Sequence, residues 1–339
     1  MENKVFYIAE VDGDTSFQDQ TLRVEKRKIY ILIAGVNYDT TQKYTFIKYS
    51  TDYKQKIENT VKDAEITVID IGSGTIITYR DKKIINTLSY DKITKEDYTE
   101  KVFTGKKKNY ISNKIIYNYI CEIGKNKSET IEEVVIFSHS YKKGVILVNS
   151  YSDNLVDLDM REEDITLKIF NLDNFKKSFS KKGVFKILGC NNHPFFHSVL
   201  AEVRKAEEKS KISKLPDNKV IKIVNDPFKD GYLISDFINN PKNYKDLKNG
   251  EIEMSILQIK RTLASLYIEC FAATLVSYID IRVIAALPST YAEFSNPTVF
   301  HISKSTKEDA NFYNKYLGVE LDNSYGVFDK ATVDRLKKI

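Results

Sequence analysis

The stretch Ile29–Val36, IYILIAGV, is a nearly unbroken run of apolar residues with the length of one β-strand. Such a run suits the middle of a parallel sheet, because helices cover both faces of the strand there. Similar runs follow along the chain, separated by segments with the apolar spacing of helices. The runs expected as further strands are Ile66–Ile71, Glu132–Ser138, Val184–Gly189 and Arg282–Leu287. This alternation predicts an α/β fold with a mostly parallel central sheet flanked by helices on both faces.

The length of 339 residues fits one large α/β domain with additions. We expect an N-terminal extension over residues 1–27 and the main domain over 28–298. A polar insertion with three prolines falls at about 209–250, and a partly helical C-terminal tail covers 299–339. A long helix is expected over Ile252–Ile279. Its most apolar part is interrupted by Glu269 and is too short for a membrane span, so we expect the helix to be buried inside the protein.

Composition and charge indicate a folded globular protein without a nucleic-acid partner. Hydrophobic residues make up 42% of the chain, and the net charge of +5 is spread along it rather than gathered in one basic run. A solvated surface explains this pattern better than a nucleic-acid interface, so no nucleic-acid partner is expected. The N-terminus MENKVFYIAEVDGD is charged and lacks the apolar core of a signal peptide. The predicted location is the cytoplasm, or outside the cell after export by a route that needs no signal peptide.

The cysteines are few and widely separated. Cys121, Cys190 and Cys270 are odd in number, and none belongs to a Cys/His cluster with zinc spacing. We therefore expect no disulfide framework, no metal site and no cofactor. Cys121 and Cys270 lie on apolar helical patterns and are expected in the core.

The stretch Ile136–Ser150, IFSHSYKKGVILVNS, contains two candidate catalytic residues. If Ser140 were the nucleophile, this would be the serine elbow of an α/β hydrolase, which needs a strand, a sharp turn with small flanking residues, and then a helix. Ser138 fits that requirement, but Lys142 does not, and the following GVILVN is β-rich and apolar. A serine hydrolase using Ser140 is therefore the third hypothesis.

If His139 works instead, a cysteine should end a neighbouring strand. Cys190 does so 51 residues later, in VFKILGC. Catalytic groups collect at the carboxyl ends of parallel strands, so the two side chains are expected at one edge of the sheet. There His139 could activate the Cys190 thiol. The backbone amides of Ser140 and Cys190 could then stabilise an oxyanion. Taken singly, each residue has a simpler interpretation, as a buried thiol or a structural histidine.

At these residues the chain resembles the caspase-like fold of cysteine peptidases, in which apolar strands end in His-Gly and in a small residue plus Cys. The stretches that carry the resemblance are VVIFSHS, VFKILGC and the opening strand IYILIAGVNYD. It is closest to bacterial caspase-like domains of unassigned role. The resemblance implies cleavage of a peptide or protein substrate by a Cys190/His139 dyad. Ser140 stands where the family has Gly, and this departure favours the alternative of a non-catalytic, toxin-type effector or interaction module.

Two other motifs lie near the strand ends. The acidic stretch Ser152–Asp164 falls between His139 and Cys190, so a solvated loop beside the site is expected. The alternatives are a pocket wall that favours Lys or Arg, or a weak divalent-cation site. The residues expected to line a substrate pocket are Asn37, Asp39, Asp157 and Asp159. The stretch Val68–Gly74, VIDIGSG, resembles a phosphate loop, but no second such loop accompanies it. A strand followed by a turn is the preferred interpretation.

Overall fold

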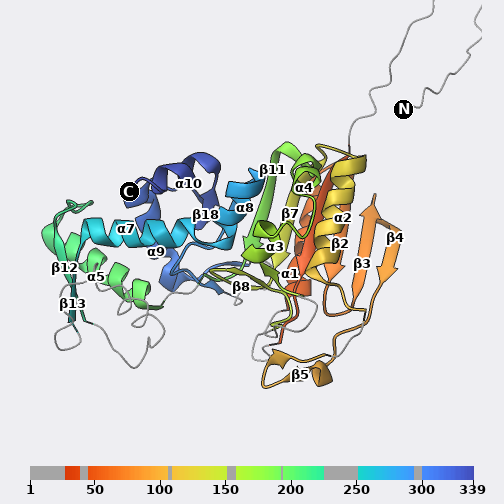
Figure 1. Cartoon of the computed structure of the whole chain (residues 1–339), viewed down its shortest axis with the longest axis horizontal. Helices are drawn as coiled ribbons and strands as arrows, with labels where there is room; N and C mark the ends of the chain where they lie inside the picture. Colours follow the sequence, from red (N-terminus) through yellow and green to blue (C-terminus); the bar gives the residue numbers. More distant parts are fainter. Residues whose placement is uncertain are drawn as a thin grey trace, which may run out of the picture.

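The computed structural model describes residues 27–38, 45–105, 109–150, 158–191, 194–224, 251–293 and 300–339. They form an α/β structure built on one nine-stranded sheet (Figure 1). From one edge to the other, its strands are β17 (Leu321–Asp322), β18 (Tyr325–Phe328), β14 (Arg282–Ala285), β11 (Phe179–Leu188), β7 (Ile131–Phe137), β1 (Lys28–Ala34), β2 (Ala64–Asp70), β3 (Thr75–Arg80) and β4 (Lys83–Ser89). The five strands from β14 to β2 are parallel, and the strands at both edges are antiparallel.

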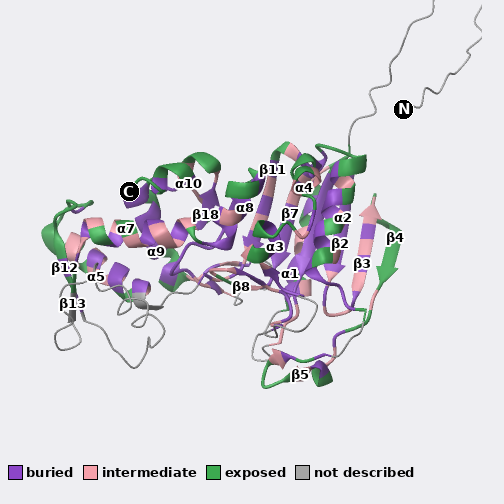
Figure 2. Cartoon of the chain, in the orientation of Figure 1, coloured by how far each residue is buried: buried purple, intermediate pink, exposed green. Residues whose placement is uncertain are grey.

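The central strands form because their residues are apolar on both faces. Every residue of β1 from Ile29 to Ala34 is buried, whereas every residue of the edge strand β4 is exposed (Figure 2). The five strands expected from the sequence are all present as β1, β2, β7, β11 and β14. The predicted α/β fold with a largely parallel centre is therefore confirmed.

Helices cover both faces of this sheet. The helices are α1 (Phe46–Thr60), α2 (Asn113–Asn126), α3 (Glu162–Thr166), α4 (Leu172–Ser178), α5 (Pro194–Ser210), α7 (Ile256–Ile268), α8 (Phe271–Ile279), α9 (Lys304–Leu317) and α10 (Lys330–Leu336). Phe46 and Tyr49 of α1 pack with Leu32 and Phe137 on one face. Ile116 of α2 packs on the opposite face, in the cluster that also holds the α4 and α8 side chains. We refer to these as the α1 face and the α2 face.

In the described part of the chain, four short antiparallel sheets lie outside the main sheet. They are formed by β5 (Tyr98–Thr99) with β6 (Val102–Phe103), by β8 (His139–Tyr141), β9 (Gly144–Ile146) and β10 (Met160–Arg161), by β12 (Val220–Val224) with β13 (Glu251–Ser255), and by β15 (Ala292–Glu293) with β16 (His301–Ile302). The sheets containing β8 and β15 follow directly on strands of the main sheet. They therefore surround its carboxyl edge.

The C-terminal residues differ from the expected tail. Strand β18 pairs with β14 inside the main sheet, with Ala285 opposite Gly326, and β17 extends that edge. All four residues of β18 are buried, so this segment belongs to the core. The expected boundary at residue 298 therefore cuts through one sheet, since the strands on either side of it are hydrogen-bonded.

The long helix expected over Ile252–Ile279 is divided in three. Strand β13 comes first, the Ser255 side chain then caps the start of α7, and Cys270 has an extended backbone between α7 and α8. Within the described part of the chain, no single helix has the length and hydropathy needed to cross a bilayer. Only α7 and α8 taken together do, and they are bent by 63° relative to each other.

The stretch Val68–Gly74 contains the end of β2 and the turn that joins it to the antiparallel strand β3. The Asp70 carboxylate accepts hydrogen bonds from the backbone N–H groups of Gly72 and Ser73 at 3.0 Å and 3.3 Å. An aspartate that bonds its own backbone in this way stabilises a tight turn. The preferred interpretation of this motif as a strand and a turn agrees with the structure.

Candidate functional site

The strands that precede His139 and Cys190 are neighbours in the sheet. Strands β7 and β11 run parallel, and Phe137 lies opposite Leu188 as the last pair of their register. His139 and Cys190 each follow two residues later, so both leave the sheet at the same carboxyl edge. This is the position at which ligand and catalytic groups of open α/β sheets gather.

The two side chains also share one face of the sheet. Phe137 belongs to the α1-face cluster, and Leu188 and Cys190 pack against that cluster. The His139 ring meets Phe46 of α1 edge to face, with 5.1 Å between ring centroids. Because side chains alternate along a strand, residues two positions after Phe137 and Leu188 return to the same face. The sheet therefore brings His139 and Cys190 together on its α1 face.

The strand ends are tightly packed against each other. The Ser140 hydroxyl donates a hydrogen bond of 2.6 Å to the Cys190 carbonyl oxygen. A Cβ atom on Gly189 would lie 2.2 Å from the Ser140 oxygen and 2.8 Å from the Ser138 carbonyl oxygen. Glycine before the cysteine is therefore a steric requirement of the close approach between these two segments.

The His139 ring is half-buried between aromatic side chains. Besides its edge-to-face contact with Phe46, it lies 4.8 Å from the Tyr38 ring, measured between centroids. Tyr38 comes from the segment after β1, the neighbour of β7 on the side away from β11. Three consecutive strands of the sheet thus place residues at this site. The aromatic packing holds the imidazole at the edge of the sheet.

The Cys190 thiol is also half-buried, and a backbone amide contacts it. The Ala292 N–H donates to the Cys190 sulfur over 3.2 Å. Burial raises the pKa of this thiol, and the Ala292 hydrogen bond opposes that rise without reversing it. In this arrangement Cys190 is therefore a protonated thiol near neutral pH. Cys121 and Cys270 are buried, as expected for core residues.

The structure does not form a serine elbow at Ser140. The segment after β7 turns into the β8–β9 hairpin, where Ser140 lies opposite Val145, and no helix follows it. The Ser140 hydroxyl is occupied by the Cys190 carbonyl rather than by a histidine. Ser140 therefore joins the two strand ends.

Three aspartates were expected to line a substrate pocket, and the structure describes one of them. Asp39 and Asp157 lie outside the described residues. Asp159 is 4% exposed, and its carboxylate accepts hydrogen bonds from the Val148 N–H, the Ser150 N–H and the Ser150 hydroxyl. These contacts hold the loop after β9 in place and turn Asp159 inward. Asp159 is thus a structural carboxylate, whereas it was expected to face a pocket.

Asn37 lies close to the site, in the segment that also carries Tyr38. Its side-chain oxygen is buried and has no hydrogen-bond partner among the described residues. Sequence reasoning did not identify three other residues around Cys190: Asn191, Ala292 and Tyr325. The run Tyr325–Phe328 has the length and apolar character of a short strand, and this was the only sequence signal that could have placed Tyr325 in the sheet.

Two other histidines contact carboxylates beyond the His139 site. His197 of α5 contacts Asp309 of α9 at 2.6 Å, and Arg204 bonds the same buried carboxylate. His301 lies 3.3 Å from Glu293 across the β15–β16 pair. Both contacts tie neighbouring elements together. Within the ranges the structure describes, no group of three or more His, Cys, Asp or Glu side chains is placed to hold a metal ion.

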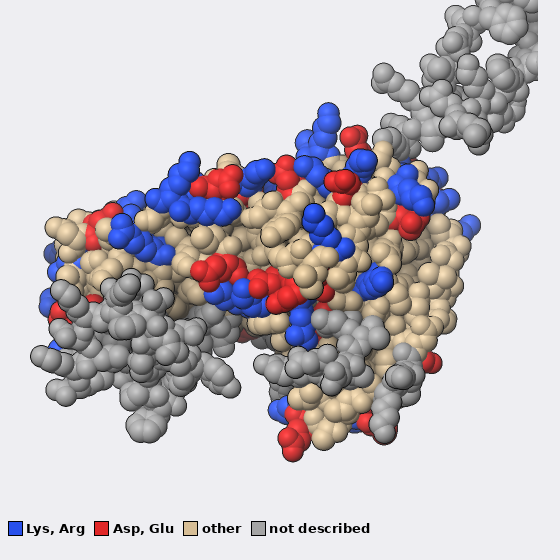
Figure 3. Space-filling view, viewed as in Figure 1, with Lys and Arg blue, Asp and Glu red and all other residues tan. Residues whose placement is uncertain are grey.

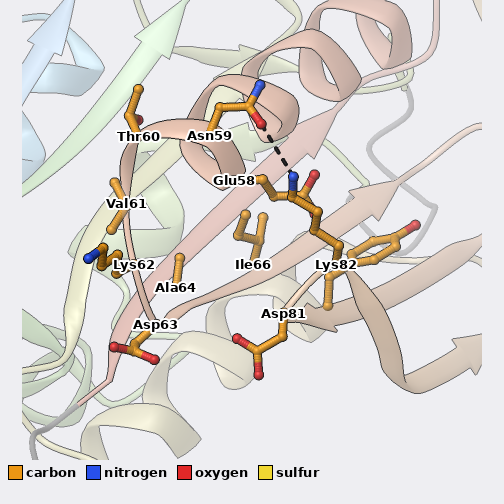
Figure 4. A pocket seen from close by; sticks show the side chains of 11 residues that line it. Glu58, Asn59, Thr60, Val61, Lys62, Asp63, Ala64, Ile66, Asp81 and Lys82 are labelled. Atoms are coloured by element: carbon orange, nitrogen blue, oxygen red, sulfur yellow. Dashed lines mark hydrogen bonds between the residues drawn. The ribbon is translucent and has the colours of Figure 1, made fainter.

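An open hollow lies at the amino ends of the parallel strands, opposite the carboxyl edge that carries His139 and Cys190. It has a volume of about 500 Å³ and lies beside the C-terminal end of α1, the start of β2 and the β3–β4 turn (Figure 4). Figure 4 shows Lys82 bonded to Asn59, with Asp63 and Asp81 at its rim. Because β2 begins here, this hollow is separated from His139 and Cys190 by the length of the strands.

Charged side chains of both signs are mixed on the surface. In the view of Figure 3, Lys and Arg lie scattered over the visible face, with Asp and Glu between them. This face shows no continuous basic stripe of the kind that follows a nucleic-acid backbone.

Comparisons with protein-family models, curated proteins and solved structures found no match to this chain. The residues at the carboxyl edge of the sheet are therefore the basis for its proposed function.

Proposed function

We propose that this chain is a caspase-like cysteine hydrolase in which Cys190 attacks a peptide or related amide bond and His139 transfers the proton. The observation that carries the proposal is the placement of both side chains on one face, at the ends of adjacent parallel strands. A nucleophile and a base brought together from distant parts of the sequence are the elements of nucleophilic catalysis. The substrate class follows from the resemblance to caspase-like peptidases.

The reaction has two steps. The Cys190 sulfur forms a bond to the carbonyl carbon while His139 accepts the thiol proton. The carbon–nitrogen bond then breaks, and His139 returns the proton to the leaving amine. Water next attacks the thioester, which releases a carboxylic acid and restores the thiol. The backbone amides of Ser140 and Cys190 are the candidate donors to the oxyanion in both steps.

Burial of Cys190 decides the role of His139. Because the pKa of this thiol is raised, a resting thiolate–imidazolium pair is not the starting state favoured by the structure. His139 would act as a general base during attack instead. Such a base typically contributes about 10²–10⁴ to the rate.

The alternative function is a non-catalytic effector or interaction module with the same fold. One observation favours it: the Cys190 sulfur is half-buried and already accepts a hydrogen bond from Ala292. A serine hydrolase is less well supported, because the Ser140 hydroxyl is bonded to the Cys190 carbonyl.

Alkylation and hydrolysis measured on the same variants would separate the enzyme from the module. Under the proposal, iodoacetamide should label Cys190 before the buried Cys121 and Cys270. A pool of unstructured peptides should be cleaved, and cleavage should fall by about 10²-fold or more in His139→Ala. His301→Ala is the matched control, because His301 lies on the strand paired with Ala292 and has no assigned role in the reaction. Equal, slow labelling of all three cysteines without cleavage would favour the module.

A further inference from the structure

Two buried polar groups near Cys190 have no hydrogen-bond partner among the described residues. They are the hydroxyl of Tyr325, a residue that is 3% exposed, and the side-chain oxygen of Asn191, a residue that is 5% exposed. Leaving a buried polar group unpaired costs on the order of 1–3 kcal/mol, so most such groups in folded proteins are paired. The two groups near the Cys190 thiol are therefore candidates for hydrogen bonds to a bound molecule.

The sheet register places Tyr325 on the Cys190 side. Ile187 of β11 pairs with Ala285 of β14, and Ala285 pairs with Gly326 of β18. One residue further toward the carboxyl edge, Leu188, Ala286 and Tyr325 are therefore the lateral neighbours on these three strands. We call these three residues a row of the sheet. These three residues pack together in one cluster, and Leu188 also packs against the α1-face cluster.

Cys190 is the next residue after Leu188 on this face, and it lies two strands away from Tyr325. Two strand spacings amount to about 10 Å across the sheet. Burial raises the pKa of the Tyr325 phenol well above its usual range, and the proximity of the Cys190 thiol raises it further.

Asn191 follows Cys190 in the chain and is held by two contacts to the segment after β14. Its backbone forms a β-bridge with Thr290, and its side-chain nitrogen donates to the Ala286 carbonyl oxygen at 3.4 Å. Ala286 is the residue opposite Tyr325 in the row described above. The unpaired oxygen of Asn191 is an acceptor, whereas the Tyr325 hydroxyl can donate.

We propose that Tyr325 and Asn191 bind the amide unit of the ligand that occupies the Cys190 site. Tyr325 donates to the carbonyl oxygen of that unit, and Asn191 accepts a hydrogen bond from its N–H group. An amide carries one acceptor and one donor, which matches the two groups left without partners. This inference rests on the proposed function and names the part of a peptide substrate that the site recognises.

Two thiol-modifying probes of Cys190 test this inference: iodoacetamide alkylates the thiol, and methyl methanethiosulfonate converts it to a methyl disulfide. Iodoacetamide carries an amide group, whereas methyl methanethiosulfonate reacts with the same thiol and has none. In Tyr325→Phe, the rate with iodoacetamide should fall about twofold to tenfold relative to the rate with methyl methanethiosulfonate, because one hydrogen bond to the amide is lost. Asn191→Ala should lower the same ratio.

The matched control is Tyr267→Phe, which also removes one buried hydroxyl. The Tyr267 hydroxyl donates to the Val327 carbonyl oxygen at 2.9 Å, so its loss should lower the urea midpoint of unfolding. It should not change the ratio of the two modification rates. Tyr325→Phe should show the reverse, with a lower ratio and a midpoint that is unchanged or higher, because an unpaired hydroxyl is removed.

The inference is overturned if Tyr325→Phe leaves the ratio unchanged or lowers the urea midpoint as Tyr267→Phe does. A Cys190 that reacts quickly with both probes, but with the same ratio in wild type and Tyr325→Phe, refutes the inference and leaves the proposed function standing. A Cys190 that reacts with neither probe refutes the proposed function, and the inference fails with it.

Discussion

Gly189→Ala should destabilise the fold, because Gly189 is where the ends of β7 and β11 approach most closely. The added Cβ would lie 2.2 Å from the Ser140 oxygen and 2.8 Å from the Ser138 carbonyl oxygen. The Ser140 side chain could rotate away, but the Ser138 carbonyl belongs to the backbone and could move only with the strand end. Overpacking of this kind typically costs about 1–3 kcal/mol. Alanine also restricts the unfolded chain, which returns about 0.4–1 kcal/mol.

The expected net loss is therefore about 1–2 kcal/mol in the free energy of unfolding. It would appear as a lower midpoint in urea with an unchanged denaturant slope. Gly72→Ala is the matched control. The nearest atom to a Cβ at Gly72 is the Asp70 carboxylate oxygen at 3.5 Å, so this variant should be neutral or slightly stabilising.

The Ser140→Gly background extends this test. It removes the nearest obstacle and leaves the Ser138 carbonyl in place, so it should recover only part of the loss. Residues in contact couple by about 0.5 kcal/mol or more in such a double-mutant cycle. If Gly189→Ala is as stable as Gly72→Ala, the close packing of the two strand ends is refuted.

Two further predictions concern the buried acid and the buried thiols. Asp159→Ala should lower the free energy of unfolding by about 3 kcal/mol, because it leaves the buried N–H groups of Val148 and Ser150 unpaired; an unchanged urea midpoint would contradict its structural role. Burial raises the pKa of Cys121 and of Cys270 to about 11. As the pH rises, the unfolded chain therefore loses these protons before the folded chain does. The free energy of unfolding should fall by about 1.4 kcal/mol per pH unit for each thiol between pH 9 and 11. Urea unfolding across this range should show a smaller fall in the Cys121→Ala/Cys270→Ala variant, and equal slopes would exclude the thiols as the cause.

Much of the central sheet could be predicted because its strands are buried on both faces. Continuous apolar runs such as Ile29–Val36 can be recognised from composition alone as strands that are buried on both faces. The adjacency of β7 and β11 also followed from the sequence, since both runs end in residues capable of cysteine–histidine chemistry. The parallel register then brings His139 and Cys190 to one edge without any further information.

The remaining features depend on contacts that local patterns do not encode. Strand β18 has only four residues, and its partner β14 is separated from it by β15, β16, α9 and β17, so the C-terminal segment resembled a tail. The break at Cys270 interrupts an apolar pattern that is compatible with one continuous helix. Asp159 looked like part of an exposed acidic loop, and only the N–H groups folded around it reveal that it points inward.

The late position of β18 in the chain has a consequence during synthesis. Tyr325 is made about 135 residues after Cys190, so the ribosome must translate nearly all of the sheet before the two can meet. Contacts between such distant residues close slowly, because the entropy of loop closure precedes the gain from packing. A nascent chain would therefore carry Cys190 without its Tyr325 neighbour. Any reactivity that depends on both residues would first appear in the finished protein.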